Sequence, residues 1–229
     1  MTKEEFLEGK VLLIDKPLEW TSFQAVNKIR WHIKKQFGLK KIKVGHAGTL
    51  DPLATGLLII CTGKKTKSIN EYQAQEKEYT GTIFLGATTP SYDLETEVNQ
   101  TFETSHITPD LIHETAKKFV GEIDQKPPIF SAIKKDGKRL YDLARKGETT
   151  EIKSRKISIS AFEITKIEMP LIAFRVSCSK GTYIRSLAND FGEALNSGAY
   201  LASLRRTKIG DFSVTDAWSI DTFIERLKG

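Results

Sequence analysis

Residues 45–61 read GHAGTLDPLATGLLIIC, which joins a glycine-rich loop to an apolar run. The loop, Gly45–Gly56, holds three glycines and one proline around a single carboxylate, Asp51, and a single imidazole, His46. The run that follows, Leu57–Cys61, has the length and composition of a buried β-strand. A loop with a fixed backbone can hold a side chain at a set angle in a site. Asp51 is therefore the first candidate functional residue, although an Asp-Pro pair can also simply begin a turn.

Predicted helices and strands surround this stretch. A helix is predicted to begin after a cap at Thr21 or Ser22, to carry an apolar stripe that includes Phe23, and to end at Gly38. A short last helix is predicted with Asp221 as its cap. Further helices are predicted at 66–72, 108–121 and 184–195, and strands at 57–61, 79–85, 157–167, 172–178 and 200–207. We expect an α+β fold with a mixed, mostly antiparallel sheet flanked by helices, in one domain that spans residues 1–229.

Composition limits the class of protein. The 229 residues are 39% hydrophobic and 28% charged, which allows a real core and is too polar for a membrane protein. The N-terminus lacks the basic-then-apolar build of a secretion signal, so we expect a cytoplasmic protein. The two cysteines, Cys61 and Cys178, each lie in an apolar run and form no zinc-binding pattern. We therefore expect neither a disulfide framework nor a metal site.

The net charge of +6 is unevenly distributed. Residues 1–80 hold 14 Lys and Arg against 9 Asp and Glu (+5), residues 81–125 hold 2 against 8 (−6), and residues 126–229 hold 19 against 12 (+7). Basic faces favour a polyanionic partner, because neutralising phosphates supplies affinity without sequence readout. The same lysines could equally serve as a solubilising surface. Charge alone therefore indicates a nucleic-acid partner without establishing one.

Residues 45–56 resemble the catalytic motif of the TruB family of tRNA pseudouridine synthases, which isomerise the uridine at conventional position 55 in the T loop of tRNA. Further segments resemble family motifs and occur in the family's order: Asp15-Lys16-Pro17, Thr21-Ser22, Lys77-Glu78-Tyr79, Pro127-Pro128, Ser131 to Lys134, Leu140-Tyr141, Ala144-Arg145, Cys178 to Arg185, and Leu204-Arg205-Arg206. The resemblance implies the pseudouridine synthase fold. It also implies a thumb-like insertion at about residues 126–150 that closes over the RNA.

The resemblance assigns the chemistry to three residues. It implies that Asp51 is the carboxylate that acts as nucleophile or base, that Arg185 pairs with Asp51 and keeps it ionised, and that Tyr79 packs on the target base. A carboxylate can form a transient adduct or accept a proton by itself, and a neighbouring arginine favours its charged form. The reaction class therefore implies no cofactor and no metal.

The resemblance also implies how RNA is held. An enzyme that acts on a base inside folded RNA must take that base out of its stack. His46 is implied to lie near the flipped nucleotide, and Tyr183 and Leu204 to contact its base. The candidate phosphate contacts are Lys16, Lys180 and Arg145, with Lys64, Lys65, Lys134, Lys138, Arg139, Arg205 and Arg206 beside them. The expected partner is the T stem-loop of tRNA, bound by a monomer without a protein partner.

Two features depart from the family pattern. Glu19 stands two residues after Pro17, where the family usually has glycine, and this places a carboxylate near a turn that would face RNA. The chain also stops soon after Phe212, whereas many members continue into a small RNA-binding domain, so we expect no full accessory domain. Two other functions stay open: a non-catalytic tRNA-binding or folding chaperone on the same scaffold, and a related synthase that acts on another RNA.

Overall fold

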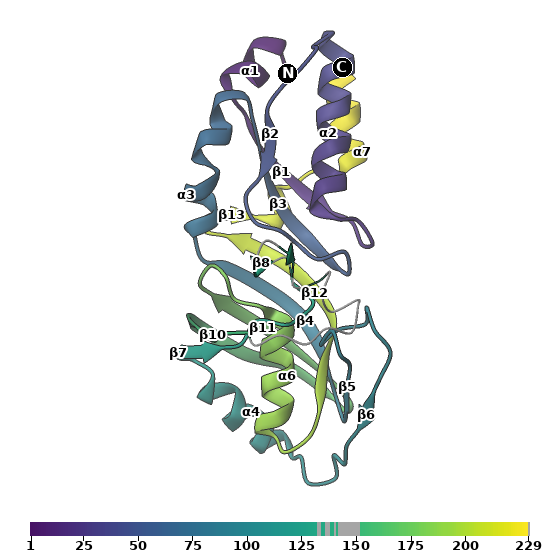
Figure 1. The fold of residues 1–229 in the computed structure, drawn as a ribbon, viewed down its shortest axis with the longest axis vertical. Helices are drawn as coiled ribbons and strands as arrows, with labels where there is room; N and C mark the ends of the chain where they lie inside the picture. The colour runs from purple at the N-terminus through teal and green to yellow at the C-terminus, as the bar shows by residue number, and fades with distance from the viewer. Residues whose placement is uncertain (132–133, 136–137, 140, 142–151, 229) are drawn as a thin grey trace. The chain divides into compact units, whose positions relative to one another are not determined.

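The computed structural model covers residues 1–229 and describes all of them except 132–133, 136–137, 140, 142–151 and 229 (Figure 1). The chain forms two compact units. Unit 1 consists of Met1–Tyr79 and Leu204–Gly229, and unit 2 consists of Thr80–Ser203. Two strands, β4 (Lys77–Leu85) and β12 (Ala199–Ile209), begin in one unit and end in the other.

Unit 1 contains a mixed sheet. Strand β1 (Val11–Lys16) pairs antiparallel with β3 (Ala54–Thr62), and β3 pairs in parallel with the part of β12 that begins at Leu204. The short strand β2 (Val44–His46) joins the other end of β3, and β13 (Phe212–Ser213) pairs with the end of β12. The predicted strand 57–61 is confirmed as the middle of β3.

Helices cover both faces of β3, which explains its unbroken apolar sequence. Leu58 and Ile60 belong to a core shared with α2 (Ser22–Phe37) and α7 (Ile220–Lys228), which pack side by side (Figure 1). Leu57 and Ile59 belong to a second core, against which side chains of α3 (Ile69–Ala74) pack. The remaining short helices of the unit are α1 (Lys3–Glu8), η1 (Gly63–Ser68) and η2 (Val214–Asp216).

Two details of the predicted helices of unit 1 are wrong. Thr21 does cap α2 and Gly38 ends it in a left-handed conformation, but Phe23 lies outside the buried stripe and is 65% exposed. The last helix is capped by Ser219, whose Oγ accepts a hydrogen bond from the Thr222 amide at 3.0 Å. Asp221 lies in the first turn instead, where a carboxylate favours the helix dipole.

Unit 2 contains a sheet with strand order β4-β11-β10-β7. Strand β10 (Arg155–Glu168) pairs antiparallel with both β11 (Leu171–Cys178) and β7 (Gly121–Gln125), and the predicted strands at 157–167 and 172–178 lie within β10 and β11. Helix α4 (Pro109–Lys118) contacts β10 and helix α6 (Ile184–Ala194) (Figure 1). Four phenylalanine rings form the core between these elements: Phe119, Phe162, Phe174 and Phe191.

Two short strand pairs complete unit 2. Strands β5 (Ala87–Thr88) and β6 (Gln100–Thr101) pair antiparallel, as do β8 (Lys134–Lys135) and β9 (Lys138–Arg139). The second pair lies within the predicted thumb-like insertion, but much of residues 126–150 falls outside the described residues, so the thumb stays a prediction. The α+β class and the mostly antiparallel sheet are confirmed. No described helix is long and apolar enough to span a bilayer.

Candidate active site

The Asp51 loop connects β2 to β3 and is fixed by hydrogen bonds on both sides. The amide of Ala54 donates to the Asp51 carbonyl at 3.1 Å. Leu50 is buried, and its amide donates to Ser22 Oγ at 2.8 Å while its carbonyl accepts from the same hydroxyl at 3.1 Å. At Gly56, φ is 104° and a Cβ atom would lie 2.3 Å from the Arg206 carbonyl oxygen. Glycine is therefore required there for β3 and β12 to approach each other.

Two buried cations bind the carbonyls of this loop. Lys16, at the end of β1, is fully buried, and its Nζ donates to the carbonyls of Pro17 at 2.8 Å, Trp20 at 2.6 Å and Pro52 at 3.4 Å. Arg206, on β12, is 1% exposed. Its guanidinium donates to the carbonyls of Leu57 at 2.7 Å, Gly48 at 3.1 Å and Thr49 at 3.5 Å. Together these bonds satisfy backbone oxygens on both sides of Asp51.

The three charges of this cluster act on one another. Burial lowers the pKa of Lys16 to about 8, the charge of Asp51 acts in the opposite direction, and Arg206 lowers the pKa further. The carboxylate therefore stabilises the charged lysine. Because the Lys16 ammonium is directed at backbone carbonyls and has no exposed surface, the predicted phosphate contact at Lys16 is not what the structure shows. The same correction applies to Arg206.

Arg205 differs from Arg206 although the two are adjacent. Its guanidinium makes two bonds with the Asp15 carboxylate, at 3.0 and 2.6 Å, and its side chain is 39% exposed. Successive side chains of a strand point to opposite faces of the sheet. This alternation places Arg206 in the interior of unit 1 and leaves Arg205 accessible from outside.

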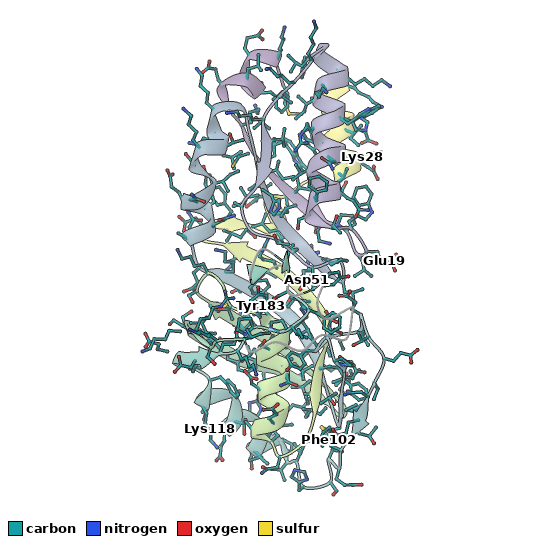
Figure 2. All side chains as sticks on the ribbon, in the orientation of Figure 1. Glu19, Lys28, Asp51, Phe102, Lys118 and Tyr183 are labelled. Atoms are coloured by element: carbon teal, nitrogen blue, oxygen red, sulfur yellow. The ribbon has the colours of Figure 1, made fainter. Side chains whose placement is uncertain are left out.

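The turn before α2 explains the glycine that the family usually has at the position of Glu19. Glu19 adopts φ 65°, the left-handed region that disfavours residues with a Cβ atom. Its amide nevertheless donates to the Pro52 carbonyl at 2.8 Å, so the turn is still attached to the Asp51 loop. The Glu19 side chain is exposed at the tip of this turn (Figure 2).

His46, Leu204 and Tyr79 also lie in unit 1. His46 ends β2 opposite Ile60 and is half-buried. Burial lowers the pKa of its imidazole, a hydrogen bond with the Gly48 backbone opposes this, and Arg206 lowers it further, so the neutral form is favoured. Leu204 lies opposite Ala54, three residues beyond Asp51. His46 and Leu204 therefore both lie on strands that pair with β3, the strand that follows the Asp51 loop.

Tyr79 lies at the start of β4 and is 9% exposed. The residue before it, Glu78, is bound to β12, because the Thr207 hydroxyl hydrogen-bonds to its carbonyl at 3.1 Å and to its carboxylate at 2.8 Å. Lys77 is buried as well and donates to the carbonyls of Gln73 and Gln75. The backbone that carries Tyr79 is therefore held on both sides.

Arg185 lies in unit 2, at the start of α6, and is 5% exposed. Its guanidinium donates to the carbonyls of Ser91 at 3.2 Å and Phe130 at 2.9 Å, and its Nε lies 3.6 Å from an Asp93 carboxylate oxygen. Asp93 is itself buried and accepts the Glu95 amide at 3.0 Å. Sequence analysis missed Asp93, although the need of a buried guanidinium for a carboxylate could have prompted a search for one.

Tyr183 and Lys180 also belong to unit 2. The backbone of Tyr183 is bound by the buried Gln125 side chain, which accepts from its amide at 2.8 Å and donates to its carbonyl at 3.0 Å. The Arg155 guanidinium lies 4.7 Å from the centre of the Tyr183 ring. Lys180 is exposed, and Arg145 lies outside the described residues. No group of three or more His, Cys, Asp or Glu side chains suited to a metal ion occurs in the described part of the chain.

Comparison with known proteins identifies the family. Residues 34–184 match the model of the TruB family pseudouridylate synthase (N terminal domain), and residues 185–228 match the tRNA pseudouridylate synthase B C-terminal domain. The chain belongs to the TruB family. It is therefore a pseudouridine synthase, an isomerase, and the resemblance found in its motifs is confirmed.

Similar proteins agree with this assignment. The chain is 69% identical to tRNA pseudouridine synthase B of Flavobacterium johnsoniae over the full length of both, and 59% identical to that of Phocaeicola vulgatus over 97% of this chain and 94% of the relative. Among solved structures, a Cbf5-Nop10-Gar1 complex contains a chain with a TM-score of 0.73 and 30% identity over 98% of this TruB-family chain. The match spans 56% of that longer chain, a little over half its length.

Proposed function

We propose that this TruB-family chain converts the uridine at conventional position 55 in the T loop of tRNA to pseudouridine, with Asp51 as the reacting carboxylate. The observation that carries the proposal is the Asp51 loop, in which backbone oxygens on both sides of the aspartate are bound by buried cations and by Ser22. Such a loop holds a carboxylate in place before any substrate binds, which reduces the reorganisation needed during reaction. The names of the relatives support tRNA as the substrate.

The chemistry balances without an added group. The glycosidic bond from C1′ of the ribose to N1 of the uracil breaks, a bond from C1′ to C5 of the same base forms, and the proton on C5 is lost while N1 gains one. Nothing is oxidised and nothing leaves, so a carboxylate that forms a transient adduct or accepts a proton suffices. Asp51 can do either of these from its half-buried position.

The other site residues have roles that follow from their surroundings. Tyr79, on a strand start held through Lys77 and Glu78, packs on the target base. Arg185 supplies the cation that pairs with Asp51 and keeps it ionised, and Asp93 and two carbonyls also bind its guanidinium. The target base leaves its stack, and His46, Leu204 and Tyr183 contact the flipped nucleotide. Lys180 and Arg145 bind phosphates of the T arm.

The experiment that tests this proposal measures tritium release from 5-tritiated uridine in an unmodified T-arm transcript. Release is expected from this transcript and not from one with cytidine at the target position. Asp51→Asn keeps the size of the side chain and removes its charge, so it is expected to reduce the rate to below about one thousandth of the wild type while RNA binding persists.

Asp110→Asn is the matched control, because Asp110 is an exposed aspartate in the first turn of α4. It is expected to react like the wild type. Substantial turnover by Asp51→Asn would refute the role of Asp51. Tight tRNA binding by the wild type without any tritium release would instead favour the chaperone function, and release only from another RNA would refute the proposed target.

A further inference from the structure

Helix α2 exposes two aromatic side chains. Phe23 is 65% exposed and Trp31 is 53% exposed, whereas Ala25, Ile29 and Ile33 on the opposite side of the helix are buried. Residues four apart lie on the same face of a helix, so Phe23 and Trp31, eight apart, share the outward face. Large aromatic groups contribute substantial burial energy and are costly to leave in water, so a pair on one outward face calls for an explanation.

The surroundings of these rings are strongly basic. Residues 20–50 contain no Asp or Glu and seven Lys or Arg: Lys28, Arg30, Lys34, Lys35, Lys40, Lys41 and Lys43. The Lys35 ammonium lies 4.9 Å from the centre of the Trp31 ring. Lys28 projects from the same helix and is exposed (Figure 2). At His32, burial lowers the pKa of the imidazole, and the charges of Lys28, Lys228 and Lys35 lower it further.

The start of α2 lies next to the Asp51 loop. The helix begins at Ser22, whose hydroxyl makes both of its hydrogen bonds with Leu50, the residue before Asp51. The preceding turn is tied to the same loop through the Glu19 amide and Pro52, and it exposes Leu18 to 54%. Leu18 and Phe23 are therefore exposed residues next in sequence to the two residues, Glu19 and Ser22, that are hydrogen-bonded to the Asp51 loop.

We propose that Leu18, Phe23, Lys28, Trp31 and Lys35 form a second RNA-contact surface, the α2 strip, which binds substrate RNA outside the reacting nucleotide. This inference rests on the proposed function of the Asp51 site. The eight-position separation between Phe23 and Trp31 spans about 12 Å of helix at about 1.5 Å per residue. That length matches about three stacked nucleotides, and aromatic rings among lysines are the composition that binds bases and phosphates together.

A protein partner or a second copy of this chain fits the strip less well. The cores of protein interfaces are depleted in lysine, because each ammonium must be desolvated. Here Lys35 lies against the ring that would be the centre of such an interface. RNA phosphates, in contrast, gain affinity from the same lysines through counterion release.

The first test reverses charge. The double variant Lys28→Glu/Lys35→Glu is compared with Lys117→Glu/Lys118→Glu, a matched pair of exposed lysines at the end of α4 in unit 2 (Figure 2). Dissociation constants for an unmodified tRNA transcript are measured over a range of salt concentrations. The α2 variant is expected to bind tRNA at least about tenfold more weakly than the wild type. The slope of its log binding constant against log salt concentration is expected to be smaller in magnitude by about one to two. The α4 variant is expected to stay within about twofold of the wild-type affinity.

The second test removes a ring. Trp31→Ala is expected to weaken tRNA binding by about tenfold, and Trp31→Phe by less, because a smaller aromatic ring still stacks on a base. Leu171→Ala is the control, since Leu171 is an exposed apolar residue of β11, 41% accessible. An equal loss in Trp31→Ala and Leu171→Ala would overturn the specific role of the ring.

The outcomes separate this inference from the proposed function. A wild-type protein that releases no tritium refutes the proposed function, whatever its affinity for tRNA. An active wild type whose α2 variants bind tRNA with unchanged affinity and salt slope overturns the α2 strip alone. The last check is sedimentation of the wild type and of Trp31→Ala without RNA. A wild type that dimerises with rising concentration, and a Trp31→Ala variant that does not, would show that the strip binds a second copy of the chain. That result would overturn the assignment of the strip to RNA.

Discussion

The two units stabilise the charges of the candidate site in opposite ways. In unit 1 the important carboxylate, Asp51, lies in a loop whose carbonyls are bound by two buried cations, Lys16 and Arg206. In unit 2 the important cation, Arg185, is bound by a buried carboxylate, Asp93, and by two carbonyls. Each unit thus supplies local partners for the charge it buries, which would otherwise be costly to desolvate.

This difference shows where substitutions should be most severe. The partners in unit 1 are mainly backbone oxygens, which stay in the protein when the cation is removed and then lack a donor. In unit 2 one of the partners of Arg185, Asp93, is a side chain, which can be replaced by a neutral isostere. Removing a donor from several buried carbonyls leaves more uncompensated groups than neutralising one carboxylate.

The largest effect is expected for Arg206→Gln. It removes the donors of the Gly48, Thr49 and Leu57 carbonyls, so we expect the free energy of unfolding to fall by about 3 kcal/mol. Because the loop then holds Asp51 less rigidly, kcat for tritium release should fall more than tenfold with a smaller change in KM. Urea denaturation and steady-state kinetics on the T-arm transcript measure the two quantities.

Arg205→Gln is the control for the adjacent residue. Its partially exposed pair with Asp15 contributes under about 1 kcal/mol, so the variant should remain nearly as stable as the wild type. If Arg205→Gln and Arg206→Gln prove equally stable and equally active, the role of Arg206 in holding the loop is wrong.

Much of the fold could be predicted from local patterns. The unbroken run Leu57–Cys61 indicated a buried strand, and Thr21 or Ser22 with Gly38 indicated the two ends of α2. The errors were also local. Phe23 matches the helical period but falls at the exposed edge of the helix, and Ser219 and Asp221 are both good candidates for a cap.

The partners of the buried charges could not be predicted in this way. From the sequence, Lys16 and Arg206 are candidate phosphate contacts, because their burial depends on carbonyls that only the folded sheet brings near them. Asp93 lies 92 positions before Arg185, and no local pattern connects the two. The family resemblance supplied Asp51 and Arg185, whereas Asp93, Gln125 and the loop-binding role of Arg206 required the structure.

A smaller effect is expected in unit 2. Asp93→Asn keeps the shape of the side chain and its acceptor for the Glu95 amide but removes the negative charge that lies 3.6 Å from the Arg185 Nε. We expect a loss of about 2 kcal/mol in the free energy of unfolding and a lower rate of tritium release. Glu163→Gln, which neutralises the exposed pair with Arg175, should cost under about 1 kcal/mol. Equal losses in the two variants would show that burial of the Arg185 pair has no energetic consequence.

The smallest effect is expected at the turn before α2, and it is a gain. Glu19 has φ 65°, where a residue with a Cβ atom costs about 1 kcal/mol more than glycine, so Glu19→Gly should raise the free energy of unfolding by up to about 1 kcal/mol. Asn196 in unit 2 also has a positive φ, 53°, but asparagine tolerates this region, so Asn196→Gly should gain less. Urea denaturation of the two variants beside the wild type measures the difference. A lower free energy of unfolding in Glu19→Gly would mean that contacts of the Glu19 side chain stabilise the turn by more than the left-handed backbone destabilises it. Glutamate at this position would then be a stabilising replacement for the glycine that the family usually has.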